Sequence, residues 1–102
     1  MIRLYEWKEF GFENSPSIRT VFQNTPYPEK EDVIRYLQKG RVYLAAFGVG
    51  KDAFTGDIVM PVVELRTDGE YRWDSMIEYY VSKYNMRLPE SFERKAVKAS
   101  KK

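Results

Sequence analysis

The sequence predicts an α+β fold in which an antiparallel sheet of about four strands carries roughly two to four helices, mainly on one face. Strand-like and helix-like stretches are interspersed, without the regular strand-helix-strand repeat of a parallel sheet. A hairpin signal, Thr67-Asp68-Gly69, separates two stretches that alternate apolar and polar residues. The chain has 102 residues, of which 43% are hydrophobic, and this is enough for one domain with a core.

The N-terminal part of the chain is expected to hold one strand and two helices. Residues 2–10 are rich in large apolar side chains and are typical of a first strand. Ser15 and Pro16 are typical of a helix start, and the apolar residues after them recur at helical spacing, which predicts a short helix. Acidic residues in a first turn and Gly40 beyond a last turn predict a longer helix over residues 29–39.

Two strands are expected next. Residues 41–50 are almost continuously apolar, which favours a central strand that is covered on at least part of both faces. Residues 50–56 are expected to form a loop. Residues 58–66 then return as a strand, with Pro61 at a bulge or an edge position because proline donates no hydrogen bond to a ladder.

A hairpin completes the predicted sheet. We expect Thr67, Asp68 and Gly69 to form a three-residue loop, because glycine enters the left-handed region without strain. The cross-strand pairs that follow are Arg66 with Glu70, Leu65 with Tyr71, Glu64 with Arg72 and Val63 with Trp73. These pairs place the apolar side chains on one face and the charged ones on the other. A two-residue Asp-Gly loop would place Leu65 opposite Arg72 and mix the two faces, so the longer loop is preferred.

A helix is expected directly after the hairpin. Asp74 or Ser75 caps its start, and Glu78 completes a capping box with Ser75. Asn85 is expected to end the helix in the left-handed conformation.

The chain is expected to form one α+β domain over residues 1–93, which ends in a helical turn or two that starts at Leu88-Pro89. Residues 94–102 are expected to be a basic, frayed tail, because they hold five basic residues and no acidic one. The rest of the chain holds 12 basic and 15 acidic residues, so the folded body is mildly acidic although the net charge is +2.

The composition excludes several kinds of chemistry. The chain has no cysteine and no histidine, which removes thiol nucleophiles, disulfides, zinc-thiolate sites and the usual general base near neutral pH. We therefore predict no enzymatic activity, no cofactor and no metal. Lys51 lies in a segment that lacks the residues of a phosphate-binding loop, and Asp52 and Asp57 are expected to be solvated turn residues. The N-terminus has no export signal and no stretch is long enough to span a bilayer, which favours the cytoplasm.

Three motifs lie in the second half of the chain. They are Thr67-Asp68-Gly69-Glu70-Tyr71-x-Trp73, Tyr79-Tyr80-Val81-x-x-Tyr84 and Leu88-Pro89-x-x-Phe92. Together with the helix upstream, they resemble a group of small uncharacterised bacterial proteins over about residues 27–92. That group has no agreed activity, so the resemblance implies no catalytic residue. The size and build of the chain are also similar to immunity proteins of bacterial toxin systems, which implies a protein partner.

The aromatic residues near the hairpin fit either a core or a contact surface. We expect Trp73, Tyr80 and Tyr84 to be in the core. Tyr79 lies off the apolar stripe of its helix and fits either role.

The sequence thus predicts a protein-binding module, such as an immunity protein that occludes the active site of a basic toxin domain. Acidic side chains at the hairpin-helix junction would meet that partner by electrostatic complementarity. The residues expected to contact the partner are Glu70, Arg72, Asp74, Glu78 and Tyr79. The alternative is a small nucleic-acid-binding domain that uses the basic C-terminal tail to contact phosphates.

Overall fold

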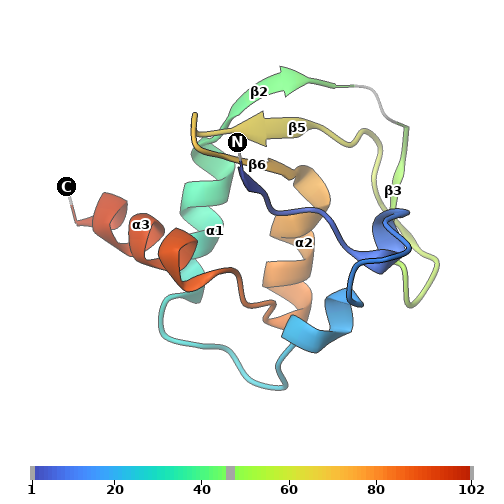
Figure 1. Cartoon of the computed structure of the whole chain (residues 1–102), viewed down its shortest axis with the longest axis horizontal. Coiled ribbons are helices and arrows are strands. Elements are labelled where there is room, and N and C mark those ends of the chain that lie inside the picture. Colours follow the sequence, from blue (N-terminus) through green and yellow to red (C-terminus); the bar gives the residue numbers. More distant parts are fainter. Residues whose placement is uncertain (1, 46–47, 102) are drawn as a thin grey trace.

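A computed structural model describes residues 2–45 and 48–101 and confirms the α+β class (Figure 1). Its helices are η1 (Lys8–Phe10), η2 (Ile18–Val21), α1 (Lys30–Lys39), α2 (Ser75–Tyr84) and α3 (Glu90–Ser100). Its strands are β1 (Ile2–Arg3), β2 (Arg41–Leu44), β3 (Gly50–Lys51), β4 (Ile58–Met60), β5 (Leu65–Thr67) and β6 (Tyr71–Asp74).

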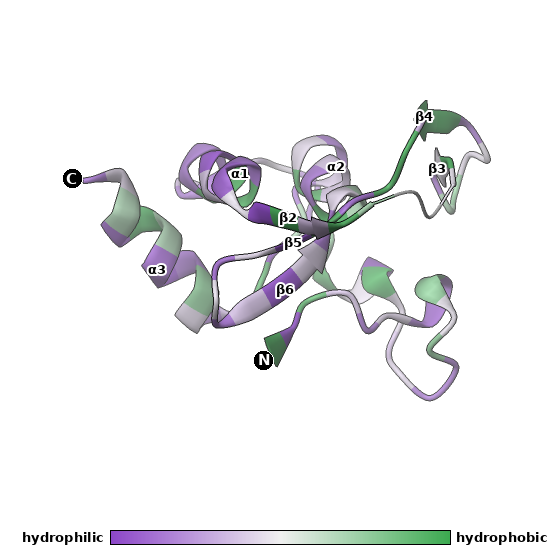
Figure 2. Cartoon of the chain, turned by 90° about the horizontal axis from the view of Figure 1, so that it is seen from above, coloured by the Kyte–Doolittle hydropathy of each residue, from purple (hydrophilic) through white to green (hydrophobic). Residues whose placement is uncertain are grey.

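Four of these strands form one sheet in the order β1-β6-β5-β2. β6, β5 and β2 are antiparallel neighbours, whereas β1 pairs with β6 in parallel, so the sheet is mixed. α1 and α2 lie side by side on one face of this sheet (Figure 2). β3 and β4 form a separate antiparallel hairpin.

Trp73 of β6 is the centre of the packing between the sheet and the helices. Its side chain is fully buried, its ring lies 5.6 Å from that of Phe92 in α3, and its indole N–H donates to the carbonyl of Leu37 in α1 at 3.3 Å. The chain leaves α1 directly over this ring, since a Cβ atom at Gly40 would lie 2.3 Å from it. Only glycine therefore fits at the end of α1.

The strand predicted for residues 2–10 is largely wrong. Only Ile2–Arg3 pairs with β6, and the chain turns away after Leu4, whose N–H donates to the carbonyl of Arg72. The large apolar side chains that follow do not alternate as a strand requires, and they pack beside the sheet instead.

The predicted hairpin register is also wrong. Leu65 pairs with Asp74 rather than with Tyr71, and the loop is longer than three residues because Thr67 pairs with Arg72. The Asp68 carboxylate favours this longer loop by accepting the backbone N–H groups of the two residues beyond Gly69, at 2.9 and 2.7 Å. As a result Leu65 shares a face with Asp74.

Arg66 occupies the helix face in this register, where the prediction placed an apolar side chain. Its guanidinium donates to the carbonyls of Gln38 and Gly40, at 2.7 and 3.2 Å, and so satisfies acceptors at the end of α1. A charged side chain is stable there because the helix terminus supplies partners for it.

Two predicted strands are also revised. β2 is an outer strand with all four residues exposed, rather than a covered central strand, and residues 46 and 47 of the predicted strand lie outside the described residues. The strand predicted for residues 58–66 is divided into β4 and β5, which belong to different sheets. The break follows Met60, where Pro61 cannot continue a ladder.

The predicted helix after the hairpin is confirmed, with Asp74 as its cap and Asn85 left-handed at φ 54°. The frayed tail is wrong for residues 94–100, which continue α3. Ala96 is buried there, and Lys95 forms ion pairs with Asp68 and Glu70 at 2.9 and 2.8 Å. These contacts hold the basic segment against the loop between β5 and β6.

Candidate functional site

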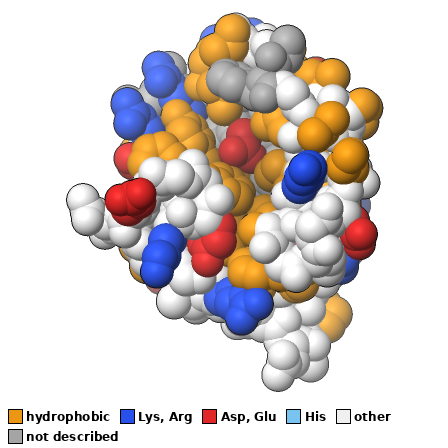
Figure 3. All heavy atoms as spheres, turned by 90° about the vertical axis from the view of Figure 1, so that its right-hand side faces the viewer, with side chains coloured by type: hydrophobic (Ala, Val, Ile, Leu, Met, Phe, Trp, Pro, Cys, Tyr) orange, Lys and Arg blue, Asp and Glu red, His pale blue; other side chains and the backbone are white. Residues whose placement is uncertain are grey.

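A cleft of about 560 Å³ opens between the N-terminal segment, the β3–β4 hairpin and the start of α2, and we call it the aromatic cleft. The side chains that define it are Tyr5, Phe10 and Phe12 from the N-terminal segment, Val49, Lys51 and Ala53 from the hairpin, and Leu65, Asp74, Met76 and Tyr80 from the sheet and α2. Figure 3 shows acidic side chains in a hollow that hydrophobic side chains surround. The volume is typical of a site for a small molecule.

Asp74 is the acidic residue of the cleft that lies at the junction of β6 and α2. Its carboxylate accepts the backbone N–H of Met76 at 2.8 Å, which caps the first turn of α2. Burial among apolar side chains raises the pKa of Asp74 to about 6, although the N–H groups of Met76 and Ile77 act in the opposite direction. The group therefore changes its charge close to neutral pH.

A carboxylate is not required to cap this helix. Asparagine caps a helix about as well as aspartate, and it would not place a charge in an apolar cleft. Among the described residues, no basic side chain forms an ion pair with Asp74. A half-buried acid whose pKa is raised in a cleft is a typical feature of a functional site.

Asp52 holds in place the wall of the cleft that the β3–β4 hairpin forms, which we call the hairpin wall. Its side chain is buried, and one of its oxygens accepts the hydroxyls of Tyr79 and Tyr84, at 2.7 and 2.6 Å, with the Lys83 ammonium at 3.4 Å. The other oxygen accepts two backbone N–H groups of its own loop, at 2.8 and 3.1 Å. The hairpin is thereby attached to α2, which supplies all three of these side chains.

Hydrogen bonding also sets the charge of Asp52. Burial alone would raise the pKa of Asp52, but the hydroxyls of Tyr84 and Tyr79 and the backbone N–H groups hold it well below its usual range. The side chain is therefore a permanent anion at neutral pH.

Two further contacts place the hairpin on α2. The N–H of Ala53 donates to the Tyr80 hydroxyl at 2.9 Å. Gly50 lies so close to α2 that a Cβ atom there would be 2.6 Å from the sulfur of Met76. The hairpin wall is therefore in direct contact with α2 along the cleft.

The opposite wall of the cleft is held by Glu9. Its carboxylate accepts the hydroxyl of Ser17 and the backbone N–H of Ile18, the latter at 2.8 Å. Burial acts to raise the pKa of Glu9, but these two hydrogen bonds lower it on balance. The acid thus joins η1 to the start of η2 and keeps the aromatic side chains of the N-terminal segment in place.

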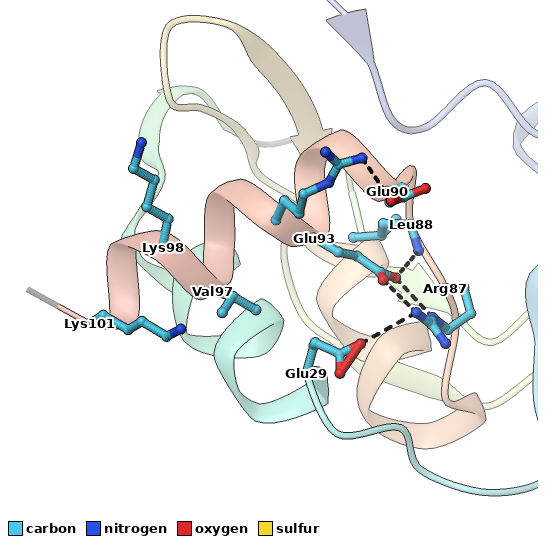
Figure 4. A pocket seen from close by; sticks show the side chains of 9 residues that line it. Glu29, Arg87, Leu88, Glu90, Glu93, Val97, Lys98 and Lys101 are labelled. Atoms are coloured by element: carbon cyan, nitrogen blue, oxygen red, sulfur yellow. Dashed lines mark hydrogen bonds and ion pairs between the residues drawn. The ribbon is translucent and has the colours of Figure 1, made fainter.

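A larger surface depression of about 810 Å³ lies beside α3, and its acidic and arginine side chains are already paired with one another (Figure 4). The Arg87 guanidinium forms two hydrogen bonds with the buried Glu93 carboxylate, at 3.0 and 2.6 Å, and lies 3.6 Å from Glu29. Lys98 extends away from this cluster. We therefore assign the depression a structural role at the start of α3.

Two of the predicted contact residues lie on the hairpin that β5 and β6 form. Glu70 is exposed and forms an ion pair with Lys95 of α3 at 2.8 Å. The Arg72 guanidinium lies over the ring of Tyr43 in β2, at 5.5 Å. They therefore contact different parts of the chain.

The other three predicted contact residues are also separated. Glu78 accepts a hydrogen bond from Gln38 of α1 at 3.4 Å, and the Tyr79 hydroxyl donates a hydrogen bond to Asp52. Asp74 lies in the aromatic cleft. The structure does not gather the five residues around a common group.

The sequence interpretation missed the aromatic cleft and the role of Asp52, which it placed in solvent. The signal for Asp52 was the turn around it, because an aspartate followed by polar and glycine residues often accepts the N–H groups of its own loop. Its contacts with Tyr79 and Tyr84 lie 27 and 32 residues away in sequence, and no local pattern predicts them.

Comparisons with known proteins found no family model, curated protein or solved structure that matches this chain. In residues 2–45 and 48–101, no group of three or more acidic side chains is arranged to hold a metal ion. No helix within the same ranges has the length and apolar character needed to cross a membrane.

Replacing Asp52 by asparagine should lower the free energy of unfolding at pH 7 by about 2–3 kcal/mol, because hydrogen bonds to a buried charge are lost. The stabilisation by Asp52 is present above the unfolded-state pKa of about 4 and is lost as the pH falls further. Urea unfolding from pH 7 to pH 2 should therefore show the gap between wild type and Asp52→Asn closing below about pH 4. Asp57→Asn, in the exposed part of the same loop, is the matched control. Equal losses in the two variants would contradict the anchoring role.

Replacing Asp74 by asparagine should have the opposite effect. The raised pKa of Asp74 means that the folded state binds a proton more tightly than the unfolded state, so stability falls as the pH rises from about 4 through about 6. Asp74→Asn keeps the cap and lacks this decline, and it should be more stable than wild type at pH 7.5 by about 1–2 kcal/mol. Thermal unfolding at a series of pH values measures the difference. A variant that is less stable than wild type across this range would show that the carboxylate is needed for folding.

Proposed function

We propose that this chain is a non-catalytic binding module whose aromatic cleft holds a small organic molecule. The observation that carries the proposal is a half-buried carboxyl group with a pKa of about 6 inside a cleft that is otherwise lined mainly by apolar side chains. Few polar groups among many apolar ones are the usual composition of a ligand site.

The geometry supports binding more than catalysis. An acid-base mechanism needs a second group that holds or receives the proton within hydrogen-bond reach of the first. Asp74 is hydrogen-bonded to backbone N–H groups, and Glu9, the other carboxylate of the cleft, is used by Ser17 and Ile18. The hydrogen bonds of both acids are thus made with the surrounding fold and not between the two acids.

The walls of the cleft support binding without a large rearrangement. Asp52 fixes the hairpin wall and Glu9 fixes the wall formed by the N-terminal segment. A cleft that is formed before binding requires little ordering of side chains when the ligand enters.

The neutral probe 2-phenylethanol should bind in the cleft in a saturable manner. Titration followed by backbone amide NMR should shift the signals of Gly50 and Leu65. Val49→Trp should weaken binding by about tenfold or more, because Val49 lines the cleft and is 50% exposed, so a larger side chain covers the opening without disturbing the core. Val62→Trp is the matched control, since Val62 is 45% exposed and lies outside the cleft. Binding that is equally weak in both variants, or that Val49→Trp leaves as strong as in wild type, would overturn the proposal.

A second candidate is the protein-binding role predicted from the sequence, and β2 is the feature that favours it. β2 is the outer strand of its sheet, and its residues Val42, Tyr43 and Leu44 are 41%, 39% and 50% exposed. An exposed apolar edge strand is a surface to which an extended segment of another protein adds. A toxin as that partner rests on the similarity of this chain to immunity proteins in size and build.

Under this second candidate, Leu44→Lys should abolish capture of a stoichiometric protein partner by the tagged chain, because a charge on an apolar edge opposes strand addition. Glu70→Lys tests the acidic surface predicted from the sequence, and it should leave capture unchanged. The measurement is affinity capture from a bacterial lysate, with nuclease treatment and mass spectrometry. Loss of the partner with Glu70→Lys alone would favour the predicted acidic surface over β2.

The remaining sequence predictions have less support. Nucleic-acid binding through the C-terminal segment would use basic side chains of which Arg94 and Lys95 already pair with acidic residues. The cytoplasmic location stays a prediction.

A further inference from the structure

We propose that the ligand of the aromatic cleft is an organic cation, an amine carried on an apolar or aromatic body, and that Asp74 is its counter-ion. This inference rests on the proposed binding function and names the chemical class of the ligand. The charges that face the cleft, the depth at which Asp74 lies and the nature of the walls support it.

The charges inside the cleft are mainly negative. The titratable groups that line it are Tyr5, Glu9, Lys51, Asp74 and Tyr80. Lys51 is exposed on β3, and within the described residues it forms no ion pair with either acid. The interior thus presents two carboxylates against one exposed lysine and favours a positive group.

Of the two carboxylates, Asp74 is the one suited to a ligand. Glu9 accepts hydrogen bonds from Ser17 and Ile18, which satisfy both of its oxygens. Asp74 accepts backbone N–H groups only, and burial disfavours its ionised form. A cation placed beside it would offset that penalty, because an opposite charge at short range favours the ionised form.

The walls suit the rest of such a ligand. Tyr5, Phe10 and Phe12 line one side of the cleft, and aromatic faces attract ammonium groups as well as apolar ones. Leu65 and Met76 lie on the sheet and helix side next to Asp74 and provide apolar contact. An apolar body with one ammonium group thus matches both the walls and the single available carboxylate.

Anionic ligands are disfavoured by the same features. The carboxylate of an anionic ligand would approach Asp74 and Glu9, and the like charges would repel one another in a partly desolvated site. A neutral ligand fits the walls but leaves the penalty on Asp74 in place. The three classes of ligand are therefore expected to bind in the order cation, neutral molecule, anion.

The test is a set of three molecules of nearly equal size: 2-phenylethylamine, 2-phenylethanol and phenylacetate. Calorimetry or NMR titration at pH 7.5 should show the amine binding at least about tenfold more tightly than the alcohol, with phenylacetate weakest. Asp74→Asn should remove the advantage of the amine and leave the affinity for the alcohol unchanged. In wild type, the affinity for the amine should fall as the pH is lowered from 7.5 to 5, because Asp74 takes up a proton near pH 6, and the alcohol should show no such decline.

The outcomes separate this inference from the proposed function. If the alcohol and the amine bind in the cleft with equal affinity, or phenylacetate binds best, the cation inference is overturned and the binding function stands. If none of the three binds, both are overturned. The comparison of the three molecules on wild type does not depend on how any variant folds. Asp57→Asn, which changes an exposed carboxylate outside the cleft, is the matched control, and an effect on the amine as large as that of Asp74→Asn would remove Asp74 from its assigned role.

Discussion

The buried carboxylate of Asp52 is the interaction on which the cleft depends. β3 and β4 form a hairpin of very short strands, and an isolated two-stranded hairpin is at best marginally stable in water. Its position is determined instead by an anion that receives the hydroxyls of Tyr79 and Tyr84. A buried charge is tolerated only when several donors surround it. Because α2 supplies these donors, the hairpin wall lies where α2 holds it.

Two aspartates near α2 show how position determines the role of a side chain. Asp52 is surrounded by donors and its pKa is lowered, whereas Asp74 has only backbone donors in an apolar cleft and its pKa is raised. The first carboxylate stabilises the fold, and the ionised form of the second opposes it. Proteins commonly retain such a locally unfavourable group where a ligand uses it. The contrast is the physical reason to place function at Asp74 and structure at Asp52.

The elements that the sequence predicts well are those determined by local signals. α1 ends at a glycine, and α2 begins at the capping residue Asp74 and ends at a left-handed Asn85, all of which are readable over a few residues. β2 and α3 are predicted poorly. For β2, an apolar run does not distinguish a covered strand from an exposed edge strand. For α3, a basic segment looks frayed as long as its acidic partners are unknown. Lys95 is an example, since its partners are 27 and 25 residues earlier in the chain.

The hairpin register links the failed prediction to the cleft. The predicted register assumed that charged side chains share one face, and it therefore placed Asp74 on a polar surface. The observed register shifts the pairing by three residues, from Leu65 with Tyr71 to Leu65 with Asp74. A shift by an odd number of residues exchanges the faces of one strand relative to the other. Leu65 therefore lies on the same face as Asp74, and Arg66 lies on the face that packs against the helices.

This exchange is stable because each displaced side chain finds a partner. Arg66 donates to the carbonyls at the end of α1, and Asp68 accepts the N–H groups of the longer loop. Asp74 then has an apolar cross-strand neighbour, Leu65, and the aromatic side chains of the N-terminal segment line the same cleft. A carboxylate that would be solvated on a flat polar face lies in a cleft instead. The candidate site is thus a consequence of side-chain capping at the end of α1 and in the β5–β6 loop, which outweighs the separation of polar and apolar faces.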